Sequence, residues 1–434
     1  MKSTLPPPDA HASRAHPEHG GTEPRVATGG TATGGTAAVP PHRGGHPAGT
    51  RLGVGRAITI ATAVAIAALA AGVSIGPAAI GLPEVVGSLI AHLPWHPAVS
   101  VPPVDSAIVW QIRLPRVILG ALVGAMLSGG GAAYQGVFRN PLADPYLLGV
   151  AAGAGLGATA VIISGGSPTL LPLAAFAGAT GAVALTYSLG TGAGWRGEGG
   201  PLADRAKARS ARNSRPGAWS EPSGQSPPRS GARRRRPRAA AAVGTTSIVL
   251  AGVAVAALLT AAQTYLQQAH SQDLQSVYAW ILGGLSGATW GQVQLILPYV
   301  LVSAIALIAH RRLLDVLRVG ETEAGTLGVN VARLRLTVVA AATLGAAAAV
   351  SVSGLIGFVG IIVPHAVRLT AGPSYRVVLP VSMIGGAAFL VLTDIAARTI
   401  QAPAEVPIGV LTAAVGAPFF LFVLRSRRAR QDQS

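Results

Sequence analysis

Few side chains in this sequence have the type and spacing that chemistry inside a protein requires. Asp394 is the only carboxylate well inside a long apolar stretch, and Arg398 follows it four residues later. Residues four apart share one face of a helix, so these two side chains can form an ion pair. An ionisable residue within an apolar span is a candidate functional site, although we favour a structural pair near the outer end of a helix.

The sequence predicts no catalytic residue, no metal site and no bound cofactor. A loop that cradles the phosphates of ATP needs the pattern Gly-x-x-x-x-Gly-Lys-Ser/Thr. Neither lysine of the chain, Lys2 or Lys207, lies in such a pattern. The chain has no cysteine, which excludes disulfides, thiol catalysis and cysteine-ligated metals. If ATP drives this protein, another chain binds it.

Two further polar groups stand out against the apolar background. Arg113 and Arg116 lie three apart in the sequence RLPR, an arrangement that suits bidentate capture of carboxylates. The connection 310–335 is long and polar, and its middle alternates small, acidic and apolar residues as a short docking helix followed by a turn would. Solvation of an exposed surface is the competing explanation for both groups, and sequence physics alone does not decide between them.

The elements that must position these residues are predicted to be membrane-spanning helices. Half of the 434 residues are hydrophobic and only 11% are charged, against roughly 25% in soluble domains. A bilayer core needs ~20 helical residues; nine apolar stretches meet that length, and a tenth is shorter. The stretches are 54–76, 117–137, 146–164, 170–190, 244–262, 292–309, 336–353, 355–367 (the shorter one), 377–397 and 406–424. We therefore predict an all-α polytopic membrane protein with about ten transmembrane helices.

The distribution of arginine determines the predicted orientation. With the N-terminus inside, most basic residues near the spans fall on the cytoplasmic side, and the outer side keeps only Arg113, Arg116 and Arg398. Both termini are then cytoplasmic, and the protein lies in the cytoplasmic (plasma) membrane. The net charge of +17 follows this membrane asymmetry, so no nucleic-acid partner is expected.

Composition also divides the chain into regions. Residues 1–50 are expected to form a disordered cytoplasmic tail, and residues 427–434 a short cytoplasmic tail. Residues 51–426 form the transmembrane domain, interrupted by a basic, disordered cytoplasmic insertion at 191–242. The arginine run at 233–236 could bind anionic membrane lipid or nucleic acid, but an inert loop that sets orientation is the favoured interpretation.

A cytoplasmic turn is predicted between the second and third spans, in the sequence FRNPLADPYLLG at 138–149. The residue before a proline avoids the helical region, so Asn-Pro and Asp-Pro both signal a turn. The residues assigned to this turn are Arg139, Asn140, Pro141, Asp144 and Pro145.

Small residues at helical spacing predict that the second and third spans pack against each other. They are Gly120, Gly124 and Ser128 in the second span, and Gly149, Gly153 and Gly157 in the third.

The stretch 113–158, RLPRVILGALVGAMLSGGGAAYQGVFRNPLADPYLLGVAAGAGLGA, resembles the signature of permease subunits of iron–siderophore, haem and cobalamin ABC importers. Three further stretches resemble the same family in the same order: GETEAGTLGV at 320–329, GLIGFVGIIVPHAVRL at 354–369 and PAEVPIGVLTAAVGAPFFLFVL at 403–424. The similar region runs from residue 52 to residue 426 and is interrupted by the insertion.

The resemblance implies a ten-helix subunit that dimerises, with a second copy or a paralogue, around a translocation path. It implies two ATPase subunits, which bind the ATP, and an extracytoplasmic substrate-binding protein. The binding protein would dock on Arg113 and Arg116, with Arg398 as a third contact. The residues implied in coupling to the ATPase are Gly320, Glu321, Ala324, Leu327 and Gly328. Those implied in the path, together with the second span, are Gly354, Gly357 and Gly360, in a segment that the resemblance implies to be broken.

The predicted function is translocation of a ferric siderophore, or a related iron chelate, haem or cobalamin, across the cytoplasmic membrane. The chain itself is then no enzyme, because ATP is hydrolysed by a partner. The first alternative is an ion- or proton-coupled secondary transporter that acts without an ATPase and uses Asp394 as its relay. The second is a membrane-bound enzyme or receptor scaffold, which the lack of a catalytic cluster disfavours.

Overall fold

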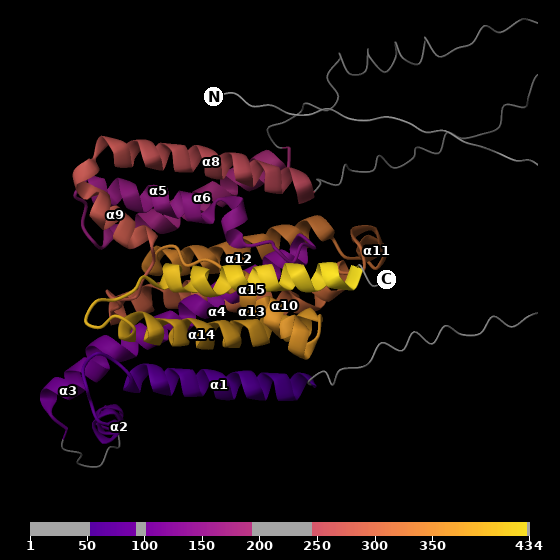
Figure 1. Ribbon diagram of the computed structural model, residues 1–434. Helices are drawn as coiled ribbons and strands as arrows, with labels where there is room; N and C mark the ends of the chain where they lie inside the picture. Colours follow the sequence, from indigo (N-terminus) through magenta and orange to yellow (C-terminus); the bar gives the residue numbers. More distant parts are fainter. Residues whose placement is uncertain (1–52, 93–100, 193–244, 432–434) are drawn as a thin grey trace, which may run out of the picture. The chain divides into compact units, whose positions relative to one another are not determined.

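The part of the chain that the structure describes is a set of packed helices. The computed structural model describes residues 53–92, 101–192 and 245–431, and it contains no strand in these ranges. Long helices lie side by side (Figure 1). They are α1 (Val54–Ser74), α4 (Leu114–Val137), α5 (Val150–Ile163), α6 (Leu170–Gly190), α8 (Thr245–Ala269), α10 (Trp290–Leu317), α12 (Val331–Ser353), α13 (Val359–Ala371), α14 (Tyr375–Thr399) and α15 (Ile408–Gln431).

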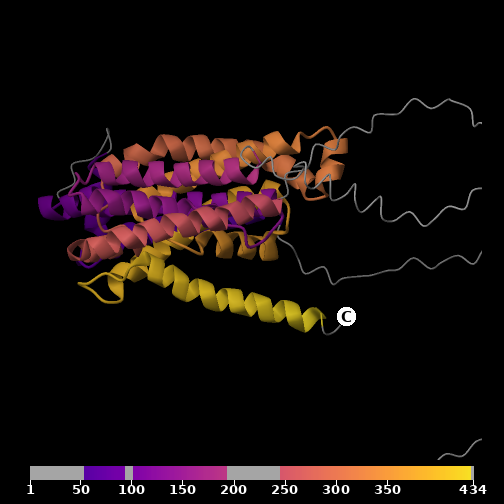
Figure 2. The same cartoon turned by 90° about the horizontal axis from the view of Figure 1, so that it is seen from above.

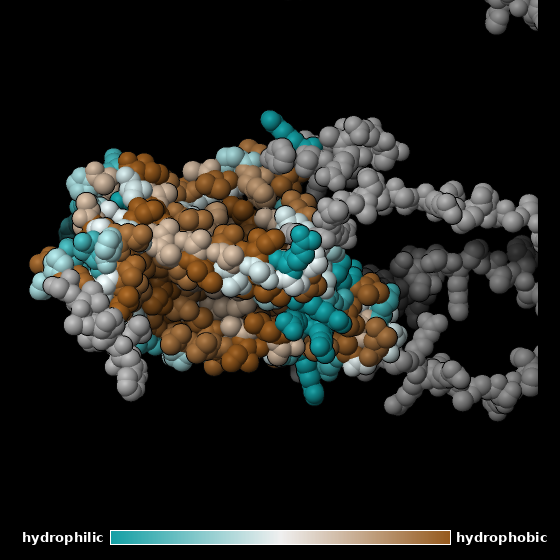
Figure 3. All heavy atoms as spheres, turned by 90° about the horizontal axis from the view of Figure 1, so that it is seen from below, coloured by the Kyte–Doolittle hydropathy of each residue, from teal (hydrophilic) through white to brown (hydrophobic). Residues whose placement is uncertain are grey.

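These long helices match the predicted apolar stretches one for one. Seven helical runs are long and apolar enough to cross a membrane, and α5, α13 and the apolar part of α15 are shorter. Hydrophobic side chains cover the middle of the face shown in Figure 3, and hydrophilic ones gather toward its ends. The prediction of an all-α polytopic membrane protein is confirmed.

Two predicted regions lie outside the described residues: the tail 1–50 and, apart from Thr191 and Gly192, the insertion 191–242. At the C-terminal end, α15 continues to Gln431. The first residues of the expected tail 427–434 therefore extend this helix.

Short helices lie in the connections and mark the two ends of the long helices (Figure 1). α2, α3 and α9 lie at one end, which the arginine distribution assigns to the outside and which we call the outer end. α11 lies at the inner end, where α1 begins and α15 ends. The short elements are α2 (Leu82–Ile90), α3 (Pro103–Ala107), the π-helix η1 (Ile108–Arg113), the 3₁₀ helices η2 (Pro145–Leu148) and η3 (Ser271–Asp273), α9 (Leu274–Ile281) and α11 (Glu321–Thr326).

α4 forms the centre of the hydrophobic core. It is buried along most of its length, and α10, α12, α13 and α14 all pack against it. α15 has fewer neighbours, α13 and α14, and it diverges from the other helices toward the inner end (Figure 2). The part of α4 in the path stays a prediction, as does that of the segment 354–360.

The small-residue stripes face other helices than the sequence suggested. A side chain on Gly124 of α4 would collide with the backbone of Gly386 in α14, and one on Gly153 of α5 would collide with Gly178 in α6. The prediction that the second and third spans pack together along these stripes is wrong. Each stripe lets its helix approach a different partner closely, α14 in one case and α6 in the other.

Candidate functional site

A buried cluster of charges lies at the outer end, and Arg116 is at its centre. Arg116 is in the first turn of α4, directly after Pro115. Its Nε and Nη2 atoms donate to the carboxylate of Asp394 on α14 at 2.8 to 3.1 Å. Its Nη1 and Nη2 atoms donate to Glu405, in the α14–α15 connection, at 2.6 and 2.9 Å. Two carboxylates therefore hold two edges of one planar guanidinium group, a strong, charge-assisted arrangement.

The other two outer arginines are also bound within the chain. Arg398 lies 3.5 Å from Asp394, as predicted, and it donates to the carbonyl oxygen of Gly72 at 2.6 Å. Arg113 donates to the carbonyl oxygens of Val73 and Ser74 at 3.0 and 2.7 Å. These carbonyls end α1, where the helix dipole favours a positive charge.

The predicted docking arginines are therefore buried. Arg113, Arg116 and Arg398 are 3%, 7% and 2% exposed. Glu405 is the open member of the cluster, with 32% of its side chain exposed, whereas the Asp394 side chain is 2% exposed. Docking at these residues stays a prediction.

The connection 310–335 contains the short helix that its pattern predicted, α11. Glu321, its first residue, accepts a hydrogen bond from Arg335 Nη2 at 2.6 Å, which ties α11 to α12. Asp315, near the end of α10, accepts bonds from Ser374 Oγ and from the backbone N–H of Tyr375, both at 2.7 Å. Because Tyr375 is the first residue of α14, Asp315 satisfies an N-terminal N–H of this helix from a neighbouring helix.

The remaining residues predicted to contact an ATPase lie around α11. Ala324 is fully buried, whereas Leu327 is 69% exposed. Gly320 and Gly328 flank the helix with φ values of 155° and 83°, which glycine adopts without the strain of a side chain. The predicted coupling residues thus share one location at the inner end, and their contact with an ATPase stays a prediction.

The structure has a turn between the second and third spans, where one was predicted, and its cytoplasmic location stays a prediction. The Asn140 side chain accepts a hydrogen bond from the backbone N–H of Leu142 at 3.0 Å. The Asp144 side chain accepts one from the backbone N–H of Tyr146 at 2.9 Å. Arg139 has a φ of 50°, a left-handed conformation that helps to end α4. Burial raises the pKa of the Asp144 carboxyl to about 6. The hydrogen bond from Tyr146 lowers this pKa, but by less than burial raises it.

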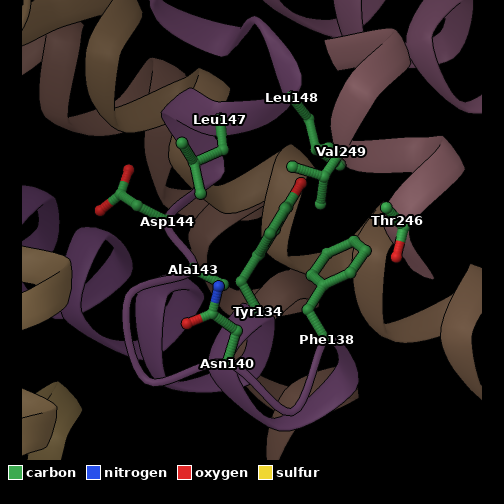
Figure 4. Close-up of a pocket in the computed structure, with 9 residues that line it drawn as sticks. All are labelled: Tyr134, Phe138, Asn140, Ala143, Asp144, Leu147, Leu148, Thr246 and Val249. Carbon is green, nitrogen blue, oxygen red and sulfur yellow. The ribbon is translucent and has the colours of Figure 1, made fainter. Parts of the chain in front are cut away.

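A cavity of about 330 Å³ lies beside this turn, between α4 and α8. Tyr134 of α4 and Phe138, directly after α4, extend toward α8, while the Asp144 carboxylate points away from the cavity (Figure 4). The Tyr134 hydroxyl is bonded to that of Thr343 at 2.7 Å. The cavity is lined mainly by apolar groups and brings no set of acids and bases together.

The predicted break at 354–360 is present between α12 and α13. The chain leaves the helical conformation after Ser353 and resumes it at Val359. Phe358, directly before α13, has a φ of 67°, a left-handed conformation unusual for a bulky residue.

Polar side chains support this irregular backbone. The Tyr146 hydroxyl donates to the carbonyl oxygen of Ile356 at 3.0 Å and accepts from its N–H at 3.1 Å. Gln135 donates to the carbonyl oxygen of Gly360 at 2.9 Å. Non-helical backbone survives within a membrane protein only where such partners satisfy it.

The three glycines of the break differ in their surroundings. A side chain on Gly354 would collide with the carbonyl oxygen of Trp280, and one on Gly360 would press on the carbonyl oxygen of Leu127. Gly357 has open space beside it. The break is confirmed, and its role in lining a translocation path stays a prediction.

Within the described ranges, no three His, Asp or Glu side chains lie close enough to hold a metal ion. Among the described residues, the ion pairs lie in the outer cluster and at the inner contacts of Asp315 and Glu321. Neither arrangement offers a nucleophile activated by a base.

Comparisons with known proteins agree with this arrangement. The chain is 40% identical to the cobalamin import system permease protein BtuC of Halobacterium salinarum, over 76% of this chain and 77% of that protein. It is 36% identical to the hemin transport system permease protein HmuU of Yersinia pestis, over 74% and 85%. It is 32% identical to the Fe(3+) dicitrate transport system permease protein FecD of Escherichia coli, over 73% and 85%.

A solved structure described as an inward-facing conformation of a metal-chelate type ABC transporter is also similar. It has a TM-score of 0.64 and 26% sequence identity, and the match covers 85% of this chain and 98% of that one. The model of the FecCD transport family matches residues 63–201 and 238–426. The chain is a membrane permease and no enzyme, and it belongs to the FecCD transport family.

Proposed function

We propose that this chain forms the membrane path of an importer for a metal chelate, and that separate ATPase subunits drive it. The observation that carries the proposal is the family match over residues 63–201 and 238–426. The similar permeases are named for cobalamin, hemin and Fe(3+) dicitrate. The substrate class is therefore a ferric siderophore or another iron chelate, haem or cobalamin.

The inner end supports an ATPase partner. Leu327, directly after α11, is 69% exposed, and the Glu321–Arg335 pair ties α11 to α12. If a bound ATPase moved α11, this ion pair would transmit the movement to the spanning helix α12. ATP is bound by the partner in this proposal, and the chain itself needs no cofactor.

The outer end and the break complete the proposal. An extracytoplasmic binding protein delivers the substrate at the cluster around Arg116, and the chelate passes between this chain and a second copy or a paralogue. The open space beside Gly357 is consistent with the break at 354–360 facing that path. Asp394 is engaged with Arg116, which supports a structural role for it over that of a proton relay.

Uptake measurements test this function. A strain that lacks this chain should lose uptake of one substrate from a panel of labelled cobalamin, haemin, ferric citrate and a ferric hydroxamate siderophore, and the restored gene should return it. Arg116→Gln should abolish that uptake while the chain still inserts in the membrane. Unchanged uptake of the whole panel in the deletion strain would contradict the proposal.

A further inference from the structure

The two carboxylates that hold Arg116 differ in their setting. Asp394 is on a long helix with 2% of its side chain exposed, and it also faces Arg398. Glu405 belongs to the connection between α14 and α15, and 32% of its side chain is exposed. Asp394 is thus a fixed part of the core, whereas the more exposed Glu405 holds the other edge of Arg116.

We infer that Glu405 stands in for a carboxylate of the docking protein, which binds the outer end by replacing Glu405 on Arg116. This inference rests on the proposed docking at the outer end. The partner is a protein surface that presents Asp or Glu side chains, because the planar guanidinium group binds carboxylates through two parallel hydrogen bonds.

Exchange of one carboxylate for another has a physical advantage over binding of the docking protein to an Arg116 that has no carboxylate on that edge. Without Glu405, Arg116 would keep Asp394 but lose two charge-assisted hydrogen bonds, so exposing this edge before a docking protein binds would be costly. When one carboxylate replaces another, the number of hydrogen bonds to Arg116 is conserved.

The exchange would also affect the connection before α15. The connection that carries Glu405 continues into this helix, whose start is tied by bonds from the backbone N–H of Ile408 to Gly283 at 3.0 Å and from that of Gly409 to Leu282 at 3.1 Å. Release of Glu405 removes a tether three residues before α15 begins. The effect is confined to the connection before α15, because the backbone bonds of Ile408 and Gly409, and that from Val406 to Ala397 at 2.9 Å, remain.

Chemical modification of the full chain in lipid nanodiscs tests the inference. Phenylglyoxal modifies accessible arginines, and mass spectrometry of the peptide that carries Arg113 and Arg116 separates the two sites. Loss of a charge-assisted bond should raise the modification rate of Arg116 by about tenfold in Glu405→Gln, and by more in Glu405→Ala. Glu84→Gln, the same change on α2 at the outer end, should leave the rate unchanged.

A hexaglutamate peptide then serves as the probe for an acidic surface. It should slow modification of Arg116 in Glu405→Ala at lower concentrations than in the wild type, and acetate at equal carboxylate concentration should not. Equal Arg116 reactivity in wild type and both variants would overturn the inference. So would parallel modification of Arg113, which indicates general loosening, or protection by acetate as strong as that by the peptide.

The modification experiment and the uptake experiment can fail independently, so failure of this inference can be told apart from failure of the proposed function. If Arg116→Gln abolishes uptake but the Glu405 variants leave Arg116 as protected as before, docking stands and the exchange is wrong. If the Glu405 variants uncover Arg116 but Arg116→Gln leaves uptake intact, Glu405 covers Arg116 and docking occurs elsewhere.

Discussion

Asp394 is the residue on which the charge balance of the outer cluster depends most. It accepts bonds from Arg116 and lies 3.5 Å from Arg398. Asp394→Asn leaves both guanidinium groups short of a counter-charge, and breaking a buried pair costs about 3–5 kcal/mol. We expect this variant to lower the thermal unfolding midpoint of the purified chain clearly, whereas Glu84→Gln should not. Equal midpoints for the two variants would contradict the cluster's structural role.

Asp144 gives the stability of the chain a pH dependence. Burial raises its pKa to about 6, above the value of about 3.9 in an unfolded chain. The folded chain therefore keeps the proton where the unfolded chain has lost it, so the stabilisation is complete below pH 4 and is lost as the pH rises through 6.

The variant Asp144→Asn isolates this effect, because its side-chain oxygen can still accept from Tyr146. We expect the variant to be more stable than the wild type at pH 7.5, by about 1–3 kcal/mol, and to match it at pH 4. Unfolding midpoints measured across this range check the prediction. A difference that does not change with pH would show that Asp144 is ionised throughout.

At the scale of single residues, the sequence predicted only contacts between residues that are close together in the chain. Asp394 and Arg398 are four residues apart, so helical geometry alone predicted their contact. The partners of Arg116, Asp394 and Glu405, are 278 and 289 residues away, and no local spacing connects them. The chemistry of the side chains could have indicated the cluster. Charged groups in a membrane need partners, and three arginines and one carboxylate were all predicted near the outer end.

At the scale of the helices, the close approach of α4 and α14 depends on Gly124. Added atoms there would meet the backbone of Gly386, so the helices would have to separate. We expect Gly124→Ala to destabilise the chain by about 1–3 kcal/mol. Gly181→Ala in α6 is a matched control, because nothing lies within 4 Å of its added atom. A Gly124→Ala variant as stable as Gly181→Ala would contradict the packing.

Asp315 connects two helices at the inner end. Its bonds to Ser374 and to the N–H of Tyr375 fix the start of α14 against α10. Loss of a helix cap costs about 0.5–2 kcal/mol, and we expect Asp315→Ala to speed amide hydrogen exchange in the first turn of α14 but not in its last turn. Uniform exchange along α14 would argue against a capping role.

The long helices themselves were predictable because a bilayer demands long apolar segments. The partners of each helix were not. The spacing of Gly120, Gly124 and Ser128 shows that one face of α4 is small, but it carries no information about which helix packs there. The break at 354–360 was found through glycine and the family resemblance, whereas its support by Tyr146 and Gln135 required the tertiary structure.

In the whole molecule, α14 joins the two ends where partners are proposed. Its first residue is bonded to Asp315 beside the α11 connection, and its last turns carry Asp394 and Arg398. A helix of 25 residues is about 37 Å long, enough to cross the membrane. One helix thus links the inner end of the described chain to its outer end.

The central claim is that this chain is a membrane path without its own source of energy. The most direct test reconstitutes the purified chain in liposomes, with and without the ATPase that copurifies with it, and follows the labelled chelate identified by the uptake panel. We predict accumulation only when the ATPase, ATP and the binding protein are all present. Accumulation by the chain alone, driven by a proton or ion gradient, would contradict the account.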